Sequence, residues 1–287
     1  MTSPILVIGA TGNVGKPLVA ALRHRGLAVR AASRSGVGPD GVEFDFGKPD
    51  TWVRAYDGVE TMFLVRPPRI SNVVRDMVPA LEAARNRGVQ HVVLLSVQGA
   101  DRIPVLPHAR LERWLQSSGM SWTFLRPSYF NQNLSTVFRE DIRDHNRILV
   151  PSGNGRTAFV DVVDIASVGA VVLQYPAAHR DRVWTPTGCE SLTFTEVAST
   201  LSEVLQRTIC YRDPGILGFF RHTRTVLGMD RGMAAVTTVI HVTARVGMAR
   251  HLTDDVRLVT GEPPLSFRSF VERERAVWET PPAPRAS

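Results

Sequence analysis

Cysteine is scarce in this 287-residue sequence, and histidine is scattered. The two cysteines, Cys189 and Cys210, are too few and too far apart for a disulfide framework or a metal site. They suit a reducing cytoplasm, which is the localisation we expect. Seven isolated histidines show no metal-ligand spacing; they are His24, His91, His145, His179, His222, His241 and His251. The sequence therefore predicts no metal site.

Lysine is nearly absent, since the basic residues are 32 arginines and only two lysines, Lys16 and Lys48. The net charge is +7, but the arginines form no basic block, and no helix-turn-helix or zinc-finger pattern occurs. We therefore expect no nucleic-acid partner. A secretory signal and an apolar run of about 18 residues are also missing, so we expect no membrane partner. The expected partner is a small-molecule substrate, bound by a monomer or homodimer.

A glycine motif stands at the start of the chain. Ile5–Ile8 is an apolar run without polar alternation, which fits a strand buried on both faces. Gly9 then permits a tight turn, Gly12 lets a pyrophosphate approach the backbone, and Gly15 lets a following helix pack closely. Free N–H groups at the helix start would face the phosphates. The motif predicts a dinucleotide-binding turn.

Strands and helices alternate through the first half, which predicts an α/β fold with a doubly wound parallel sheet of the Rossmann type. Further strands are expected at Leu27–Ala32, Val42–Phe46, Glu60–Val65, His91–Ser96 and Ser121–Arg126. One helix is expected between the fourth and fifth strands. Its core stripe has helical spacing and comprises Val74, Met77, Val78 and Leu81.

The residues that follow the strands are the candidates for ligand binding. Ser33-Arg34-Ser35 stands where an NAD-selective fold would place an acid, and a guanidinium with two hydroxyls favours the 2′-phosphate of NADP(H). Asp45 and Phe46 lie where an adenine could be flanked, although a Phe after a strand is as often core. Arg66 follows the fourth strand and could narrow the nicotinamide side or meet an acidic substrate.

The Tyr and Lys pair of short-chain dehydrogenases, in which the Lys lowers the pKa of a proton-donating Tyr, is impossible here. The helix expected after the fifth strand instead carries His108 and Glu112, one turn apart. On one helix face, Glu112 could orient His108 or raise its pKa. His108 could donate a proton to substrate, hydrogen-bond the nicotinamide ribose, or form a structural bond with Glu112. Sequence leaves the three roles open.

Three motifs in order, namely Gly9–Gly15, His108-x-x-x-Glu112 and Thr123–Asn133, resemble the NmrA-like atypical short-chain dehydrogenases. The segments Val160–Ala166 and Thr187–Ala198 are similar to later motifs of that family. The closest resemblance is to the branch with bacterial quinone reductases, triphenylmethane reductases and ergot-alkaloid reductases. The resemblance implies cofactor contacts from Gly9, Thr11, Gly12, Asn13, Val14, Gly15, Arg34, Asp45 and Ser96. We add Phe46, Arg66, His108, Glu112, Ser128 and Tyr129 as cofactor candidates, and His108 and Tyr129 as catalytic candidates.

The resulting domain prediction is an NADP(H)-binding Rossmann domain at 1–150, with returning segments at 157–190. A smaller, mainly helical substrate lobe follows at 191–280, and a flexible, proline-rich tail at 281–287. The helices expected over 212–261 suit an apolar substrate, but an ordinary helical cap with buried Met and Phe fits equally well. Their apolar residues are Phe219, Phe220, Leu227, Met229, Met233, Val236 and Val239.

Three classes of function remain. The first is an NADPH-dependent reductase of a small, apolar, conjugated or imine- or quinone-type substrate, with a place in secondary metabolism. Such substrates need little acid catalysis, which makes the missing Tyr and Lys tolerable. The second is an NADP-binding, redox-sensing regulator without turnover. The third is a non-redox cyclase or isomerase that uses the same cleft.

Overall fold

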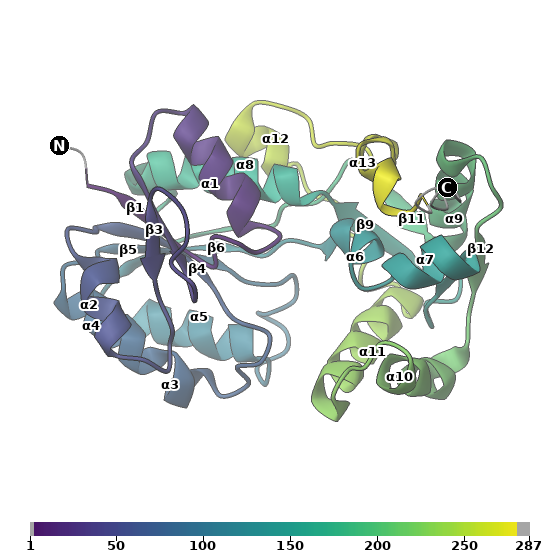
Figure 1. Cartoon of the computed structure of the whole chain (residues 1–287), viewed down its shortest axis with the longest axis horizontal. Coiled ribbons are helices and arrows are strands. Elements are labelled where there is room, and N and C mark those ends of the chain that lie inside the picture. The colour runs from purple at the N-terminus through teal and green to yellow at the C-terminus, as the bar shows by residue number, and fades with distance from the viewer. Residues whose placement is uncertain (1–2, 280–287) are drawn as a thin grey trace, which may run out of the picture. The chain divides into compact units, whose positions relative to one another are not determined.

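The computed structural model of the chain describes residues 3–279, and the predicted tail at 281–287 lies outside them. The chain divides into two compact units, and each is built from separate stretches of sequence (Figure 1). The first unit takes the chain up to Ser128, then Val162–Pro186 and Asp254–Glu262. The second takes Tyr129–Asp161, Thr187–Thr253 and the described residues from Pro263 onward.

A seven-stranded parallel sheet forms the centre of the first unit and confirms the predicted fold class. Its strands, in spatial order, are β10 (Arg182–Trp184), β6 (Ser121–Leu125), β5 (His91–Leu95), β4 (Thr61–Val65), β1 (Ile5–Ile8), β2 (Val29–Ser33) and β3 (Gly41–Glu43). All four residues of β1 are buried, as expected for a strand covered on both faces. The order changes direction at β1 and β4, where ligands of open α/β sheets bind beyond the carboxyl ends.

Helices cover both faces of this sheet. On one face lie α1 (Gly15–His24), α8 (Val162–Gln174) and α12 (Asp255–Thr260), and on the other lie α2 (Asp50–Tyr56), α3 (Val73–Asp76), α4 (Val78–Asn86) and α5 (Pro107–Ser117) (Figure 1). The 3-10 helix η1 spans Pro176–His179. Helix α8 comes close to α1, because a Cβ at Gly169 would lie 3.3 Å from Leu18 Cδ1. The close packing on both faces makes the sheet a rigid base for residues at its edge.

Met77, Val78 and Leu81 of the predicted core stripe are buried, but the single helix predicted between the fourth and fifth strands is interrupted. The structure has two helices, α3 and α4, with a break at Met77. The Asn72 side chain caps α3, and Pro79 stands in the first turn of α4, where its missing N–H costs nothing. As a result Val73 is buried, whereas Val74 of the predicted core stripe is 56% exposed.

The second unit is mainly helical, as predicted for the C-terminal lobe. Its helices are α6 (Gln132–Ser135), α7 (Arg139–His145), α9 (Phe194–Leu205), α10 (Gly215–Thr225), α11 (Arg231–Arg245), α13 (Phe267–Glu274) and the 3-10 helix η2 (Arg275–Val277). It also holds short strands in the orders β11-β9-β7 and β12-β8, which are β7 (Tyr129–Phe130), β8 (Arg147–Leu149), β9 (Arg156–Val160), β11 (Ser191–Thr193) and β12 (Cys210–Arg212).

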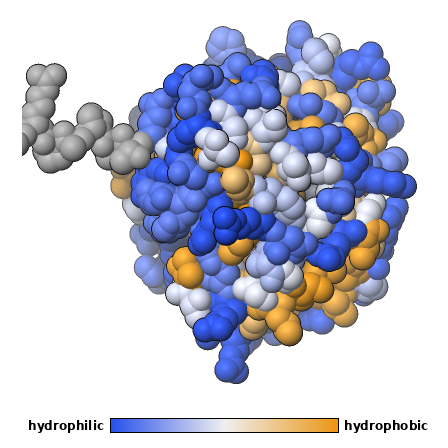
Figure 2. All heavy atoms as spheres, turned by 90° about the vertical axis from the view of Figure 1, so that its right-hand side faces the viewer, coloured by the Kyte–Doolittle hydropathy of each residue, from blue (hydrophilic) through white to orange (hydrophobic). Residues whose placement is uncertain are grey.

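The helices predicted over 212–261 are present, but their apolar residues divide between core and surface. Phe219 is fully buried, whereas Val236 and Val239 of α11 are 51% and 57% exposed. Figure 2 shows hydrophobic side chains gathered over the lower part of the face it draws. Among residues 3–279, no helix is both long and apolar enough to cross a membrane.

Candidate functional site

The glycine loop joins β1 to α1, and its glycines have different structural roles. Gly9 adopts a positive φ of 81°, and its carbonyl oxygen accepts a hydrogen bond of 2.9 Å from the Gly12 N–H. A Cβ at Gly15 would lie 2.1 Å from that same oxygen, so the helix start packs directly on the loop. A Cβ at Gly12 would meet only the Gly9 oxygen, at 3.3 Å, and would otherwise lie in open space. Gly12 thus keeps space free outside the loop.

The start of α1 is suited to an anion. Val14 is its N-cap and makes no side-chain cap, and no acidic residue stands in the first turn. The Lys16 N–H donates to the Gly12 carbonyl at 3.0 Å and Pro17 has no N–H, so the Gly15 N–H is the donor at the helix start that has no partner among the described residues. It lies at the positive end of the helix dipole. Thr11 and Asn13 are exposed beside it, whereas Val14 is buried. Because Gly12 has no side chain, the space outside this loop stays open to an anion such as a pyrophosphate.

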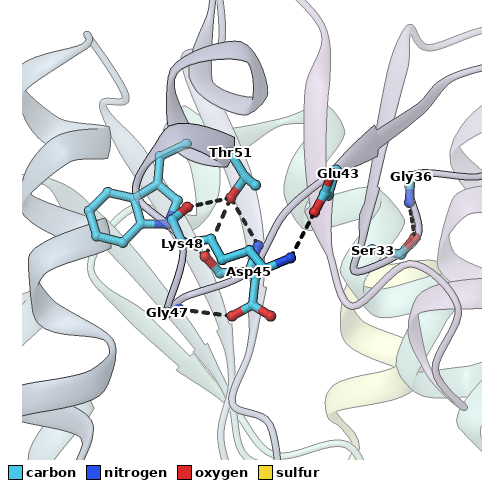
Figure 3. Close-up of polar contacts among 8 residues, drawn as sticks. Ser33, Gly36, Glu43, Asp45, Gly47, Lys48 and Thr51 are labelled. Carbon is cyan, nitrogen blue, oxygen red and sulfur yellow. Dashed lines mark hydrogen bonds and ion pairs between the residues drawn. The ribbon is translucent and has the colours of Figure 1, made fainter.

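A cation without a partner follows β2. Arg34 is exposed and makes no ion pair or side-chain hydrogen bond with the residues that the structure describes. Its neighbour Ser33 accepts a hydrogen bond of 3.1 Å from the Gly36 N–H through Oγ (Figure 3). The turn is therefore closed by its own hydroxyl, and the guanidinium stays available for a phosphate.

The loop after β3 contains Asp45 and Phe46, which were predicted to lie beside an adenine, and its structure differs in part from that prediction. The strand predicted to run to Phe46 ends at Glu43, because Asp45 Oδ1 turns back to accept from the Gly47 N–H at 2.8 Å (Figure 3). The Phe46 ring is 9% exposed and packs edge-on against Phe44 with ring centres 5.0 Å apart. The ring of Phe46 thus belongs to the core, which was the alternative that the sequence left open.

Lys48 is a cation that sequence reasoning did not place at this end of the site. Its Nζ lies 3.4 Å from Glu43 Oε1 (Figure 3), and Glu43 is opposite Ser33 in the β2–β3 register. Thr51 Oγ1 accepts from the Asp45 N–H at 3.1 Å and fixes the same loop. The signal available in the sequence was that Lys48 is one of only two lysines.

Arg66, Ser96 and Arg126 lie side by side beyond β4, β5 and β6. Val65 is opposite Leu95, and Leu95 is opposite Leu125, so the next residue of each strand falls at the same level of the carboxyl edge. The Ser96 N–H also donates to the Leu125 carbonyl at 2.7 Å. The sheet register therefore brings these three polar side chains to one edge.

The Glu112 carboxylate forms its hydrogen bonds with residues of this edge. It does not bond to His108, which was one of the possibilities left open by the sequence. It is buried and accepts from Ser96 Oγ at 2.5 Å, and from Arg126 Nε and Nη2 at 3.0 and 2.6 Å. Asp101 lies 3.5 Å from the other terminal nitrogen of Arg126. The hydrogen bond to Glu112 raises the pKa of Arg126 above its usual value. Arg126 is thus a member of the site that sequence reasoning passed over.

His108 pairs with Arg66. The Arg66 Nε donates to His108 Nε2 at 3.3 Å, which puts the imidazole proton on Nδ1. Burial, and then the charge of Arg66, lower the pKa of His108 to about 3. The predicted rise in the pKa of His108 is therefore wrong, and the imidazole is neutral at neutral pH. Of its three possible roles, proton donation to substrate is the least compatible with this state.

Ser128 and Tyr129 fall into different units. Ser128, in the first, is buried, and its Oγ has no hydrogen-bond partner among the described residues. Tyr129, in the second, packs its ring 5.4 Å from Phe159 and 5.5 Å from His241 between ring centres. Burial raises the pKa of its phenol above the usual value. These surroundings favour packing rather than catalysis as the role of Tyr129.

Comparisons with known proteins agree with this architecture. A model of the NmrA-like family matches residues 1–214. NAD(P)H azoreductase from Xenophilus azovorans is 30% identical over 96% of this chain and 99% of its own length, and festuclavine synthase II from Penicillium roqueforti is 29% identical over 96% and 99%. The Escherichia coli NADPH-dependent quinone oxidoreductase, solved with NADPH, has a TM-score of 0.80 at 22% identity, over 94% of this chain and 99% of that one.

Proposed function

This chain belongs to the NmrA-like family, and from that premise we propose that it is an NADPH-dependent reductase of a small, apolar, conjugated substrate of the quinone, azo or imine type. The observation that carries the proposal is the glycine loop, whose open Gly12 and uncapped helix start fit a dinucleotide pyrophosphate. The resemblance to ergot-alkaloid enzymes supports a place in secondary metabolism. Bound NADPH would supply the hydride.

The protein's own groups hold the cofactor and orient the substrate. The loop from Gly9 to Gly15 would bind the pyrophosphate through backbone N–H groups, and Arg34 would bind the 2′-phosphate. His108 is neutral and its Nε2 lone pair is taken, so the site offers no evident imidazole acid. Such a site suits electrophiles that accept a hydride with little acid catalysis.

Purified protein with NADPH and a panel of one quinone, one azo compound and one cyclic iminium ion tests this function. We expect NADPH absorbance to fall with at least one acceptor, in step with a product two mass units heavier for a quinone. Binding of NADPH without oxidation by any acceptor would contradict the proposal and favour a regulator. Conversion of a substrate without loss of NADPH would favour a non-redox enzyme instead.

The cofactor preference is tested at Arg34. Arg34→Ala should weaken NADPH binding by about 10- to 100-fold and leave NADH binding unchanged, because a charge-assisted contact is worth about 1.5–3 kcal/mol and tenfold corresponds to about 1.4. Calorimetric titration with both cofactors measures this difference. Arg87→Ala is the matched control, since Arg87 is an exposed arginine that precedes β5 at the opposite edge of the sheet. Equal affinity of the native protein for both cofactors would count against the preference.

A further inference from the structure

The two arginines at the carboxyl edge differ in how their charges are balanced. Arg126 is paired with the carboxylates of Glu112 and Asp101. Arg66 is half-buried, and no carboxylate among residues 3–279 lies within ion-pair distance of it. A partly buried cation without a counter-charge is costly unless a ligand meets it.

Arg66 is also held firmly. Its Nη1 donates to three backbone carbonyls, those of Pro67, Pro68 and Ile70, at 3.0, 3.3 and 2.6 Å. Its Nε donates to His108. These acceptors are neutral dipoles, so they orient the guanidinium without cancelling its charge. Among the described residues, Nη2 has no hydrogen-bond partner.

Arg66 lies at the middle of the carboxyl edge of the sheet, near the glycine loop. A Cβ at Gly9 would lie 3.2 Å from the Cβ of Val65, the residue before Arg66. On the other side, Val65 is opposite Leu95, which precedes Ser96. Arg66 therefore stands between the glycine loop and the end of β5, where the strand order of the sheet reverses.

We propose that Arg66 donates from Nη2 to an oxygen of the substrate, so that the preferred substrates carry a carbonyl or carboxylate oxygen on the conjugated system. His108 is a positioning residue that accepts from Nε and holds the guanidinium in this orientation. The inference rests on the proposed function and narrows it to quinone- or enone-type acceptors over acceptors that lack oxygen. Arg66 could instead donate to a phosphate oxygen of the cofactor. The test distinguishes the two by measuring substrate binding and cofactor binding separately.

The test compares Arg66→Met with Arg69→Met, which removes an exposed arginine from the same loop. The quantity measured is the affinity of a quinone for protein saturated with NADP⁺, by calorimetry, which requires no turnover. We expect Arg66→Met to weaken quinone binding by about 10- to 100-fold, the value of a hydrogen bond to a charged group, and Arg69→Met to leave it unchanged. Binding of NADPH should stay within threefold of the native value in both variants.

Three other outcomes contradict the inference, and a fourth contradicts only the proposed function. If Arg66→Met weakens NADPH binding tenfold, the oxygen belongs to the cofactor. If an oxygen-free iminium ion loses as much kcat/KM as the quinone, the charge of Arg66 does not select oxygen. If the native protein with NADP⁺ binds no quinone, the inference is wrong even if an iminium ion is reduced. Absence of all NADPH oxidation, with quinone binding intact, overturns the proposed reductase and not the role of Arg66.

The role of His108 is tested by rescue and by a double variant. His108→Ala should weaken quinone binding in the native background but have no further effect when added to Arg66→Met, because it acts through that guanidinium. His108→Gln, which can present an acceptor oxygen near the position of Nε2, should restore most of the affinity. Additive losses of quinone affinity would show that His108 acts on binding independently of Arg66, and a lower melting temperature with unchanged quinone affinity would show that His108 only supports the helix; either result contradicts its positioning role.

Discussion

Arg126→Met is expected to lower the free energy of unfolding by about 3–5 kcal/mol, because it leaves the buried carboxylate of Glu112 without its cation. Arg126 is bound to both oxygens of that carboxylate, and the two side chains are only 15% and 5% exposed. Solvent therefore cannot replace the lost partner. Urea denaturation at neutral pH, with the slope of the transition checked for constancy, measures the change.

Two further variants show whether the loss comes from the unpaired carboxylate. Arg126→Met combined with Glu112→Met should recover most of the stability, because apolar side chains of similar volume can replace a buried ion pair at little cost. Arg75→Met removes an exposed arginine from its pair with Asp76 and should leave the transition unchanged. Equal losses in the single and double Arg126 variants would mean that packing, not charge, determines stability here.

Gly12→Val is expected to weaken NADPH binding by at least about 100-fold, or about 2.8 kcal/mol, with little change in melting temperature. The valine side chain would occupy the open space that a pyrophosphate needs, while its Cβ meets only one loop oxygen at 3.3 Å. Fluorescence titration with NADPH and thermal denaturation followed by circular dichroism give the two quantities. A dissociation constant within threefold of the native value would mean that this glycine is structural.

Gly15→Val is the matched comparison, and it should lose both binding and stability. Its Cβ would lie 2.1 Å from the Gly9 oxygen and 2.9 Å from the Ala10 Cα, so the helix or the loop must move. The two substitutions introduce the same side chain three residues apart. A similar melting temperature for both variants would contradict the separate roles assigned to these glycines.

Features set by local sequence could be predicted well. The bounds of β1 and the start of α1 follow from an apolar run and glycines that exclude a Cβ, and both are as expected. The position of Arg34 was also predictable, because β2 ends at Ser33 and the residue that follows a strand lies at the carboxyl edge of the sheet. The helical spacing of His108 and Glu112 was also correct. It could not reveal their partners, because Arg66 follows β4 and Arg126 follows β6, which lie on either side of β5 and reach the helix only in the folded sheet.

Contacts between distant segments were even harder to predict in the second unit. Strands as short as β7, β8 and β12 carry too few residues for a periodic pattern, and no strand was predicted there. Their pairing joins distant segments, as in Cys210 with Arg147. Val74 gives a local example, since its exposure depends on a helix break that spacing alone does not predict.

The way the chain alternates between its two units bears on how the protein is made. The glycine loop is translated early in its unit, yet α8, which packs against α1, and β10, which extends the sheet, follow only after the first stretch of the second unit, Tyr129–Asp161. Asp255 is translated later still, and its Oδ2 accepts from the Thr185 N–H at 2.6 Å. The first unit is therefore completed only after Asp254–Glu262 has been translated, behind two stretches of the second unit, and no single cut in the polypeptide releases either unit intact.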